Sequence, residues 1–270
     1  MIRAGVGAVP TGTGVEHGAV MWVGPERETD EVLGTQMASW FVRGRNPPVV
    51  CVHGAGVSSR QTLPLLEALD GRVETWAVDM PGYGESGEPG RFLHVPELAD
   101  ALVQWFRTRG LDRPCLLGVS LGTQVVAEAA AREPDAVGSV VLAGPTTDPA
   151  ARSLPALAAR LVHNNFYEGL GVIPQSFRDY RAAGARRVLL SWVESRNHRI
   201  EGVLPEVGQP ALVVWGTNDK LSRRFWAEEV TRMLPRGRLA AIPGKPHALT
   251  AAAPGELAGL VEEFVAGEER

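Results

Sequence analysis

The chain has 270 residues, enough for one large domain or one domain with an insertion, and enough to bury a core without disulfides or metals. Hydrophobic residues make up 44% and charged residues 21%, which excludes a chain that is disordered throughout. Lysine and arginine number 27 against 31 acidic residues, a formal net charge of −4, which disfavours a nucleic-acid-binding protein.

The two cysteines and the N-terminus set expectations for the compartment. Cys51 and Cys115 each lie in an apolar run, which predicts two buried, reduced thiols and no disulfide or zinc site. The N-terminus shows no basic segment followed by an apolar stretch, and no run approaches ~18 apolar residues. We therefore expect a cytoplasmic protein without a signal peptide, a membrane span, a metal or a cofactor.

The first forty residues give weak patterns. Residues 4–14 are rich in glycine, but they lack the Lys-Ser/Thr pair that a phosphate-binding P-loop needs after its last glycine. We expect a loosely packed N-terminal arm here. Ala19–Val23 and Ser39–Arg43 are predicted to be short strands, and the polar stretch between them is predicted to be a connection.

From residue 48 onward, buried strands alternate with amphipathic helices, as continuous apolar runs and helically spaced apolar residues indicate. The predicted strands are Pro48–Val52, Val73–Val78, Pro114–Val119, Val137–Ala143, Ala211–Trp215 and Arg238–Ile242. The predicted helices are Arg60–Leu69, Val95–Arg109, Ser120–Glu133, Phe225–Leu234 and Pro254–Ala266. This alternation predicts an α/β fold with a mostly parallel eight-stranded sheet flanked by helices.

The alternation stops after residue 144. Residues 145–207 have helical patterns but no buried-strand run, and they are longer than an ordinary connection, which suggests a functional role. We therefore predict a core domain, residues 1–144 and 208–270, that carries a helical insertion at 145–207.

A nucleophile motif lies at the end of the predicted strand Pro114–Val119. Gly118-Val119-Ser120-Leu121-Gly122 has the form G-x-S-x-G between a strand and a helix. A sharp turn there would lift Ser120 above the sheet, and glycines on both sides would remove side chains for which the turn has no room. The alternative is that Ser120 only caps the helix.

A serine nucleophile needs a base, and the base needs an acid that orients it. In this context the partners follow in the order serine, acid, histidine. His247 and Asp219 each follow a predicted strand, so both would lie with Ser120 at the carboxyl edge of the sheet. Asp148 is the alternative acid, because it follows the predicted strand Val137–Ala143 and could reach His247 from there.

Four other polar residues are expected to be structural. Asp79 lies in a turn where its carboxylate would bond backbone amides, and His53 would brace the loop after the strand Pro48–Val52. His198, like His163, falls in the insertion, where a surface or packing role is expected.

For an oxyanion hole we expect the amides of Leu121 and of Ala55 in the loop His53-Gly54-Ala55-Gly56.

Taken together, the motifs HGAG, DMPGYGES, GVSLG, WGTND and PHAL resemble those of the α/β-hydrolase superfamily, from about residue 35 to the C-terminus. The resemblance implies a Ser120–His247–Asp219 triad and a helical cap at 145–207 over the pocket. It also implies a mechanism in which Ser120 attacks a carbonyl and water resolves the acyl-enzyme.

Single positions favour one branch of that superfamily. Epoxide hydrolases and haloalkane dehalogenases have an aspartate where this chain has Ser120. Carbon–carbon bond hydrolases usually carry a tryptophan after the histidine and a methionine after the serine, where this chain has Ala248 and Leu121. A serine carboxylesterase or lactonase is the expected function. The alternatives are a carbon–carbon bond hydrolase of a diketone-type substrate, an acyltransferase, and a non-catalytic ligand-binding protein of this fold.

The aromatic and charged side chains of the insertion indicate what kind of substrate to expect. Phe166, Tyr167 and Trp192 are expected to line an apolar pocket, so the substrate is expected to be a small, largely apolar ester, lactone or thioester. Residues 149–204 hold eight arginines against four acidic residues, a net charge of +4. These arginines could form a solvated face, bind a substrate carboxylate or dock an acidic partner. The expected partner is a small-molecule acyl substrate, not nucleic acid or a membrane, and a homodimer is compatible with the sequence.

Overall fold

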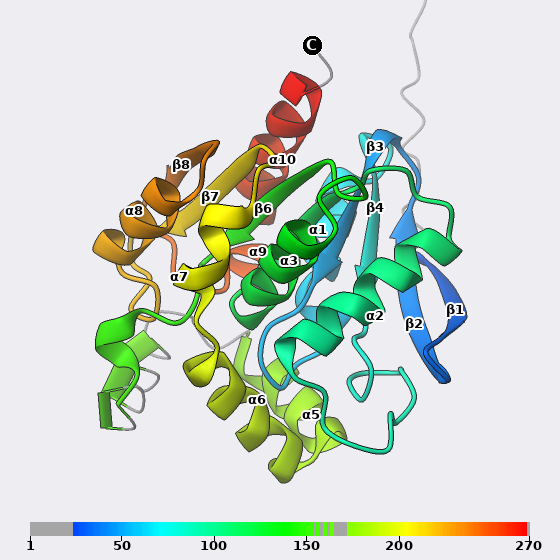
Figure 1. Cartoon of the computed structure of the whole chain (residues 1–270), viewed down its shortest axis with the longest axis horizontal. Coiled ribbons are helices and arrows are strands. Elements are labelled where there is room, and N and C mark those ends of the chain that lie inside the picture. Colours follow the sequence, from blue (N-terminus) through cyan, green and yellow to red (C-terminus); the bar gives the residue numbers. More distant parts are fainter. Residues whose placement is uncertain (1–23, 154, 157–158, 161–162, 165–171, 269–270) are drawn as a thin grey trace, which may run out of the picture.

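The computed structural model describes residues 24–268, except 154, 157–158, 161–162 and 165–171. Its centre is an eight-stranded sheet in the order β1-β2-β4-β3-β5-β6-β7-β8 (Figure 1). The strands are β1 (Glu26–Val32), β2 (Thr35–Val42), β3 (Arg45–Val52), β4 (Val73–Val78), β5 (Cys115–Val119), β6 (Ser139–Ala143), β7 (Ala211–Gly216) and β8 (Gly237–Ile242). β2 is antiparallel to both its neighbours, and β3 to β8 are parallel, so the predicted fold class is confirmed.

Helices cover both faces of the sheet (Figure 1). The helices are α1 (Leu63–Leu69), α2 (Val95–Thr108), α3 (Leu121–Arg132), α5 (Val172–Ala183), α6 (Ala185–Asn197), α7 (Ile200–Val203), α8 (Arg224–Met233), α9 (Leu249–Ala252) and α10 (Pro254–Glu268). Short 3-10 turns are η1 (Ser59–Gln61), η2 (Pro149–Ala151) and η3 (Leu204–Glu206). None of the helices in the described part is both long and apolar enough to cross a bilayer.

The core consists of two apolar clusters, one on each face of the sheet. On one face, α2, α3 and α8 pack through residues such as Trp105, Val125 and Trp226. On the other face, α1 and α10 pack through residues such as Leu66 and Leu257. The central strands contribute side chains alternately to both clusters, which is why their sequences are continuous apolar runs.

The segment between β6 and β7 contains α5, α6 and α7 and adds no strand to the sheet in its described residues. Figure 1 shows α5 and α6 side by side below the sheet. α5 contacts η1, which follows the carboxyl end of β3, so this segment lies at the edge where the parallel strands end.

One strand was not predicted. β1 occupies the polar stretch that we expected to be a connection, and the expected strand Ala19–Val23 lies outside the described residues. β1 is an edge strand that pairs only with β2, and Val32 is its one fully buried residue. Backbone pairing at a sheet edge needs no apolar side chains, so the hydrophobic pattern carries no signal for it.

A polar contact fixes β1 against α2. The Nε1–H of the buried Trp105 donates to Oδ2 of Asp30 at 3.0 Å, and Arg109 pairs with the same carboxylate. Arg109 also lies over the ring of Trp76, 5.3 Å from its centroid. Asp30 therefore provides a hydrogen-bond acceptor for the indole N–H of Trp105, a residue that solvent does not reach.

Asp30→Ala is expected to lower the free energy of unfolding by about 1–3 kcal/mol, because it leaves the indole N–H of Trp105 buried without an acceptor. Urea denaturation followed by tryptophan fluorescence measures the change. The control is Glu31→Ala, an exposed neighbour on the same strand, with an expected effect within about 0.5 kcal/mol. Equal effects of the two substitutions would show that the contact contributes nothing.

Candidate active site

Ser120 lies on a strained turn between β5 and α3. Its backbone has φ 56° and ψ −117°, a region that residues other than glycine rarely occupy. Its N–H donates to the carbonyl of Ala143 at 3.1 Å, and its carbonyl accepts from the hydroxyl of Thr123 at 2.6 Å. The side chain of Ser120 makes no capping hydrogen bond to α3, so the helix-cap interpretation does not explain it.

The two flanking glycines are required by close packing. A methyl group at Gly118 would lie 2.3 Å from the carbonyl oxygen of Gly122. A methyl group at Gly122 would lie 2.3 Å from the carbonyl oxygen of Val52 at the end of β3. Both contacts are with backbone atoms, which cannot move aside. The steric reason that the sequence gives for both glycines is therefore confirmed.

Asp219 and His247 form a buried pair at 2.7 Å between Oδ2 and Nδ1, and each residue is at most 5% exposed. The other carboxylate oxygen of Asp219 accepts from the N–H groups of Leu221 and Ser222, both at 2.8 Å. Because the carboxylate oxygens accept all three hydrogen bonds, Nδ1 of His247 carries the hydrogen. Nε2 is then the basic nitrogen of the ring.

Backbone contacts between two loops bring this pair together. The N–H of Thr217 donates to Ile242 at 3.1 Å, and the N–H of Asn218 donates to Lys245 at 2.9 Å. A methyl group at Gly216 would lie 2.4 Å from the carbonyl oxygen of Lys245, so only glycine permits this approach. The loops after β7 and β8 therefore run side by side, which sets the position of the histidine relative to the aspartate.

Gly144 connects the serine turn to the histidine. Its neighbour Ala143 accepts the N–H of Ser120, and its own N–H donates to Val214 at 2.9 Å. Gly144 has φ +58°, and a methyl group there would lie 2.9 Å from Cε1 and Nδ1 of the His247 ring. Asp219 and His247 thus lie against Gly144, and the backbone of Ser120 is bonded to the residue before it, at the carboxyl ends of β5, β7 and β8.

The loop after β3 lies beside Ser120. A methyl group at Gly54 would lie 3.3 Å from Cβ of Ser120, and the N–H of Gly54 donates to Oε1 of Gln61 at 2.7 Å. Ala55, the next residue, is buried. Leu121 is the first residue of α3, so its N–H has no acceptor within the helix. Leu121 and the loop that carries Ala55 therefore both border the serine turn.

His53 braces this loop, as predicted. Its Nε2 accepts the N–H of Met80 at 3.2 Å, so Nδ1 is the donor to the carbonyl of Gly54 at 2.9 Å. Burial lowers the pKa of His53, although the nearby Asp79 raises it, and the ring is neutral in this arrangement. Asp79 is structural as well, since it accepts the backbone N–H groups of Ser59 at 2.7 Å and Glu85 at 2.6 Å.

The alternative acid Asp148 is engaged elsewhere. Its Oδ2 pairs with Arg160 at 2.7 Å and with Arg223 at 3.0 Å, and its Oδ1 accepts the N–H of Ala150. Burial alone would raise the pKa of Asp148, but the hydrogen bonds from Arg160 and Ala150 hold that pKa below its ordinary value. Asp148 therefore links the segment after β6 to the start of α8.

The predicted pocket residues are only partly described. Phe166 and Tyr167 lie outside the described residues. Trp192 lies on α6, half-buried, and lines a groove of about 480 Å³ together with Tyr180 and Val188. Among the arginines of this segment, those at positions 152 and 187 form ion pairs with Glu201 and Glu88. His198 pairs with Glu128 at 2.9 Å, a packing role as expected.

Sequence reasoning missed three residues around the site: Gly144, Gln61 and Asp179. Gly144 follows a predicted strand directly, which could have marked it as a point of close approach. Gln61 and Asp179 carry no such signal, because their roles depend on contacts between segments that are distant in the sequence.

Comparison with known proteins agrees with this fold. Residues 49–260 match the model of the alpha/beta hydrolase family. The 2-(acetamidomethylene)succinate hydrolase of Mesorhizobium japonicum is 26% identical, over 83% of this chain and 89% of its own length. A bifunctional biotin biosynthesis protein of Cellvibrio japonicus is 27% identical, over 81% of this chain and 47% of its own length. The crystal structure of an esterase from Rhodococcus sp. ECU1013 shares the fold with a TM-score of 0.71 and 20% identity, over 90% of this chain and 98% of that one.

Asp148→Asn is expected to reduce stability at pH 7 by about 1–3 kcal/mol, because both arginine pairs lose their carboxylate. The pKa of Asp148 is lower in the folded chain than in the unfolded chain, so the carboxylate stabilises the fold above pH ~4. That contribution is lost as the pH falls through the folded-state pKa.

Urea denaturation at several pH values tests this expectation. The difference between wild type and Asp148→Asn should shrink as the pH falls below ~4. The exposed Asp135, replaced by asparagine, serves as the control with little effect at any pH. A difference that stays constant between pH 7 and pH 3 would contradict the assignment.

Proposed function

Because the chain belongs to the alpha/beta hydrolase family, we propose that it is a serine hydrolase that forms an acyl-enzyme on Ser120. Its substrate is a carboxylic ester, lactone or thioester of a small, largely apolar molecule. The observation that carries the proposal is the buried pair of His247 and Asp219 at 2.7 Å, which lies next to the strained serine turn across Gly144.

The proposed chemistry uses these groups in two steps. Nε2 of His247 takes the proton of the Ser120 hydroxyl while Oγ attacks the substrate carbonyl carbon. Asp219 keeps the hydrogen on Nδ1 and stabilises the imidazolium that forms. The imidazolium then protonates the leaving group. Water, deprotonated by the same nitrogen, attacks the acyl carbon and restores the free serine.

The oxyanion that develops in both steps needs two donors. The N–H groups of Leu121 and Ala55 fill this role in the proposal. The amide of Leu121 opens α3, so the positive end of the helix dipole adds to its hydrogen bond. One such donor contributes about 3 kcal/mol of transition-state stabilisation.

The segment 145–207 acts as a cap over the acyl pocket in this proposal. Support comes from the contact of α5 and α6 with the loop after β3, where a methyl group at Gly56 would lie 3.1 Å from the Tyr180 ring. Trp192, with Phe166 and Tyr167, would supply apolar surface to the substrate. Water excluded beneath such a cap strengthens the interactions that stabilise the oxyanion.

A fluorophosphonate tests the nucleophile directly. Wild type is expected to gain the mass of one adduct in intact mass spectrometry, and Ser120→Ala is expected to gain none. Ser191, a buried serine of α6, provides the control, because Ser191→Ala should still be labelled. If a well-folded wild type gains no adduct, the hydrolase proposal fails and a ligand-binding role becomes the better interpretation.

The acid is assigned by comparing two asparagine variants. Asp219→Asn is expected to lower kcat for p-nitrophenyl esters by about 10³–10⁴-fold, because the wrong histidine tautomer forms. Asp148→Asn should change kcat by less than about threefold, since its carboxylate binds two arginines instead. The reverse ranking would assign the acid to Asp148.

Gly144 provides a test of the arrangement of the site. Gly144→Ala and Gly184→Ala both place a side chain at positive φ, which costs about 1–3 kcal/mol. Only the methyl group at position 144 would meet the His247 ring, because the space around position 184 is open. We expect a loss of kcat of about 10-fold or more for Gly144→Ala alone. Equal kcat values for both variants would contradict the proposed position of the ring.

A further inference from the structure

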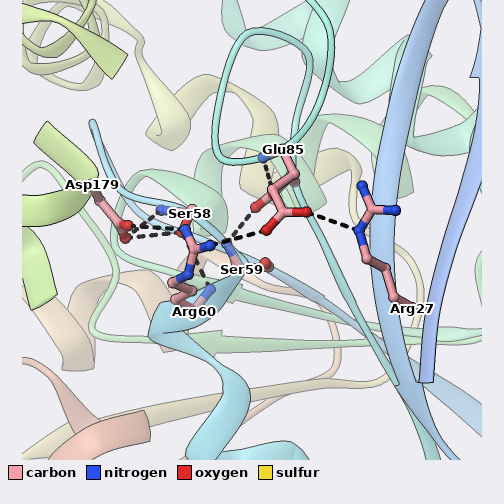
Figure 2. A network of polar contacts seen from close by, with 7 residues as sticks. Arg27, Ser58, Ser59, Arg60, Glu85 and Asp179 are labelled. Carbon is pink, nitrogen blue, oxygen red and sulfur yellow. Dashed lines mark hydrogen bonds and ion pairs between the residues drawn. The ribbon is translucent and has the colours of Figure 1, made fainter. Parts of the chain in front are cut away.

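A buried carboxylate on α5 holds the loop after β3. Asp179 is 4% exposed, and its Oδ2 accepts both the N–H of Ser58 at 3.1 Å and the hydroxyl of Ser58 at 2.9 Å. Figure 2 shows the Asp179 side chain pointing from α5 to Ser58. These two residues are 121 positions apart, so the contact joins the segment between β6 and β7 directly to the core.

Arg60 extends this contact into a charged network (Figure 2). Its guanidinium lies 3.7 Å from Oδ1 of Asp179 and 3.0 Å from Oε1 of Glu85. Glu85 also pairs with Arg27 of β1 at 2.8 Å. The carboxylate of Asp179 thus has a donor pair on Ser58 and a cation nearby, which offsets the cost of burying its charge.

The held loop is the one that carries an amide assigned to the oxyanion hole. On one side of Ala55, the N–H of Gly54 is fixed by Gln61 at 2.7 Å. On the other side, Ser58 is fixed by Asp179, and the next residue, Ser59, by Asp79 at 2.7 Å. Residues 55–57 therefore form a short span between two fixed points, Gly54 and Ser58. Gln61 holds the first, and Asp179, which lies on α5, holds the second.

The packing of α5 and α6 follows the same loop. Gly56 has φ +73°, and a methyl group there would lie 3.1–3.2 Å from the side chains of Tyr180 and Val188. If α5 moved away, the N–H of Ser58 would lose its acceptor and Gly56 would lose its packing partners. The loop would then have no contact with α5 to hold its conformation, so it would be free to rearrange when α5 leaves.

We propose that Asp179 is a positioning residue that couples the docking of α5 to the assembly of the oxyanion hole. The Ala55 amide then points at the substrate only while α5 is docked. The inference rests on the proposed function for its catalytic consequence, but the coupling between Asp179 and the loop can be measured without any activity.

The kinetic test compares two carboxylates that both tie this segment to the core. Asp179 binds the loop after β3, whereas Glu194 of α6 binds the backbone N–H of Val95 at 3.0 Å and His94 at 2.8 Å, both at the start of α2. Asp179→Ala is expected to lower kcat for p-nitrophenyl acetate by about 10- to 100-fold with KM within about twofold, because full loss of one oxyanion donor costs about 10²–10³-fold. Glu194→Ala should leave kcat within about twofold.

A conservative variant keeps the test valid if Asp179→Ala does not fold. Asp179→Asn retains an oxygen that accepts from Ser58, so its kcat is expected to lie between wild type and the alanine variant. Equal losses of kcat in the Asp179 and Glu194 variants would overturn the proposal, since docking in general would then explain them. A change in KM alone would overturn it too.

Hydrogen–deuterium exchange provides the readout that does not depend on catalysis. Peptides covering residues 53–57 are expected to exchange at least about tenfold faster in Asp179→Ala than in wild type and at an intermediate rate in Asp179→Asn. Their exchange is expected to be unchanged in Glu194→Ala. Unchanged exchange in the Asp179 variants would overturn the coupling. If the fluorophosphonate fails to label wild type while this exchange pattern holds, the coupling stands and the proposed function is what fails.

Discussion

The architecture of the site depends on a hydrogen-bond ladder that continues one residue beyond the ends of the parallel strands. The N–H of Ser120 reaches Ala143, and the N–H of Gly144 reaches Val214, so the turn after β5, the end of β6 and β7 stay in register. The same register places the loops after β7 and β8 beside each other, where Asp219 meets His247. Side chains that are far apart in the sequence therefore meet because the backbone beneath them is aligned.

That alignment has to accommodate buried polar groups, and the carboxylates and the imidazole around the site are held by local partners. Asp79 and Asp219 each accept two backbone N–H groups, and Asp148 accepts one together with two arginines. His53 is satisfied by a backbone donor and a backbone acceptor. Polar side chains of this kind replace water around the site, which keeps the loops in one conformation at modest energetic cost.

The features that the sequence predicts are those that leave a local pattern. Buried parallel strands appear as apolar runs, and the turn at Ser120 appears as a motif between such a run and a helix. β1 leaves no apolar pattern, because an edge strand can meet the rest of the fold through polar contacts, such as that of Asp30 with Trp105. The contact of Asp179 with Ser58 also leaves none, since it depends on how the segment between β6 and β7 packs. Periodicity describes one element at a time and carries no information about which loop that element touches.

The absence of side chains at Gly56 and Gly144 limits how the site can diversify. Both glycines have positive φ, and a Cβ at either position would make an unusually close contact with a neighbour, Tyr180 or the His247 ring. Natural variation or directed evolution therefore cannot reshape this part of the site by enlarging those loops. Under the proposed function, a change of ligand preference would come instead from residues of α5 and α6 such as Trp192, which lines a groove on these helices. Libraries aimed at new ligands would best sample those helices and leave the glycine-rich loops unchanged.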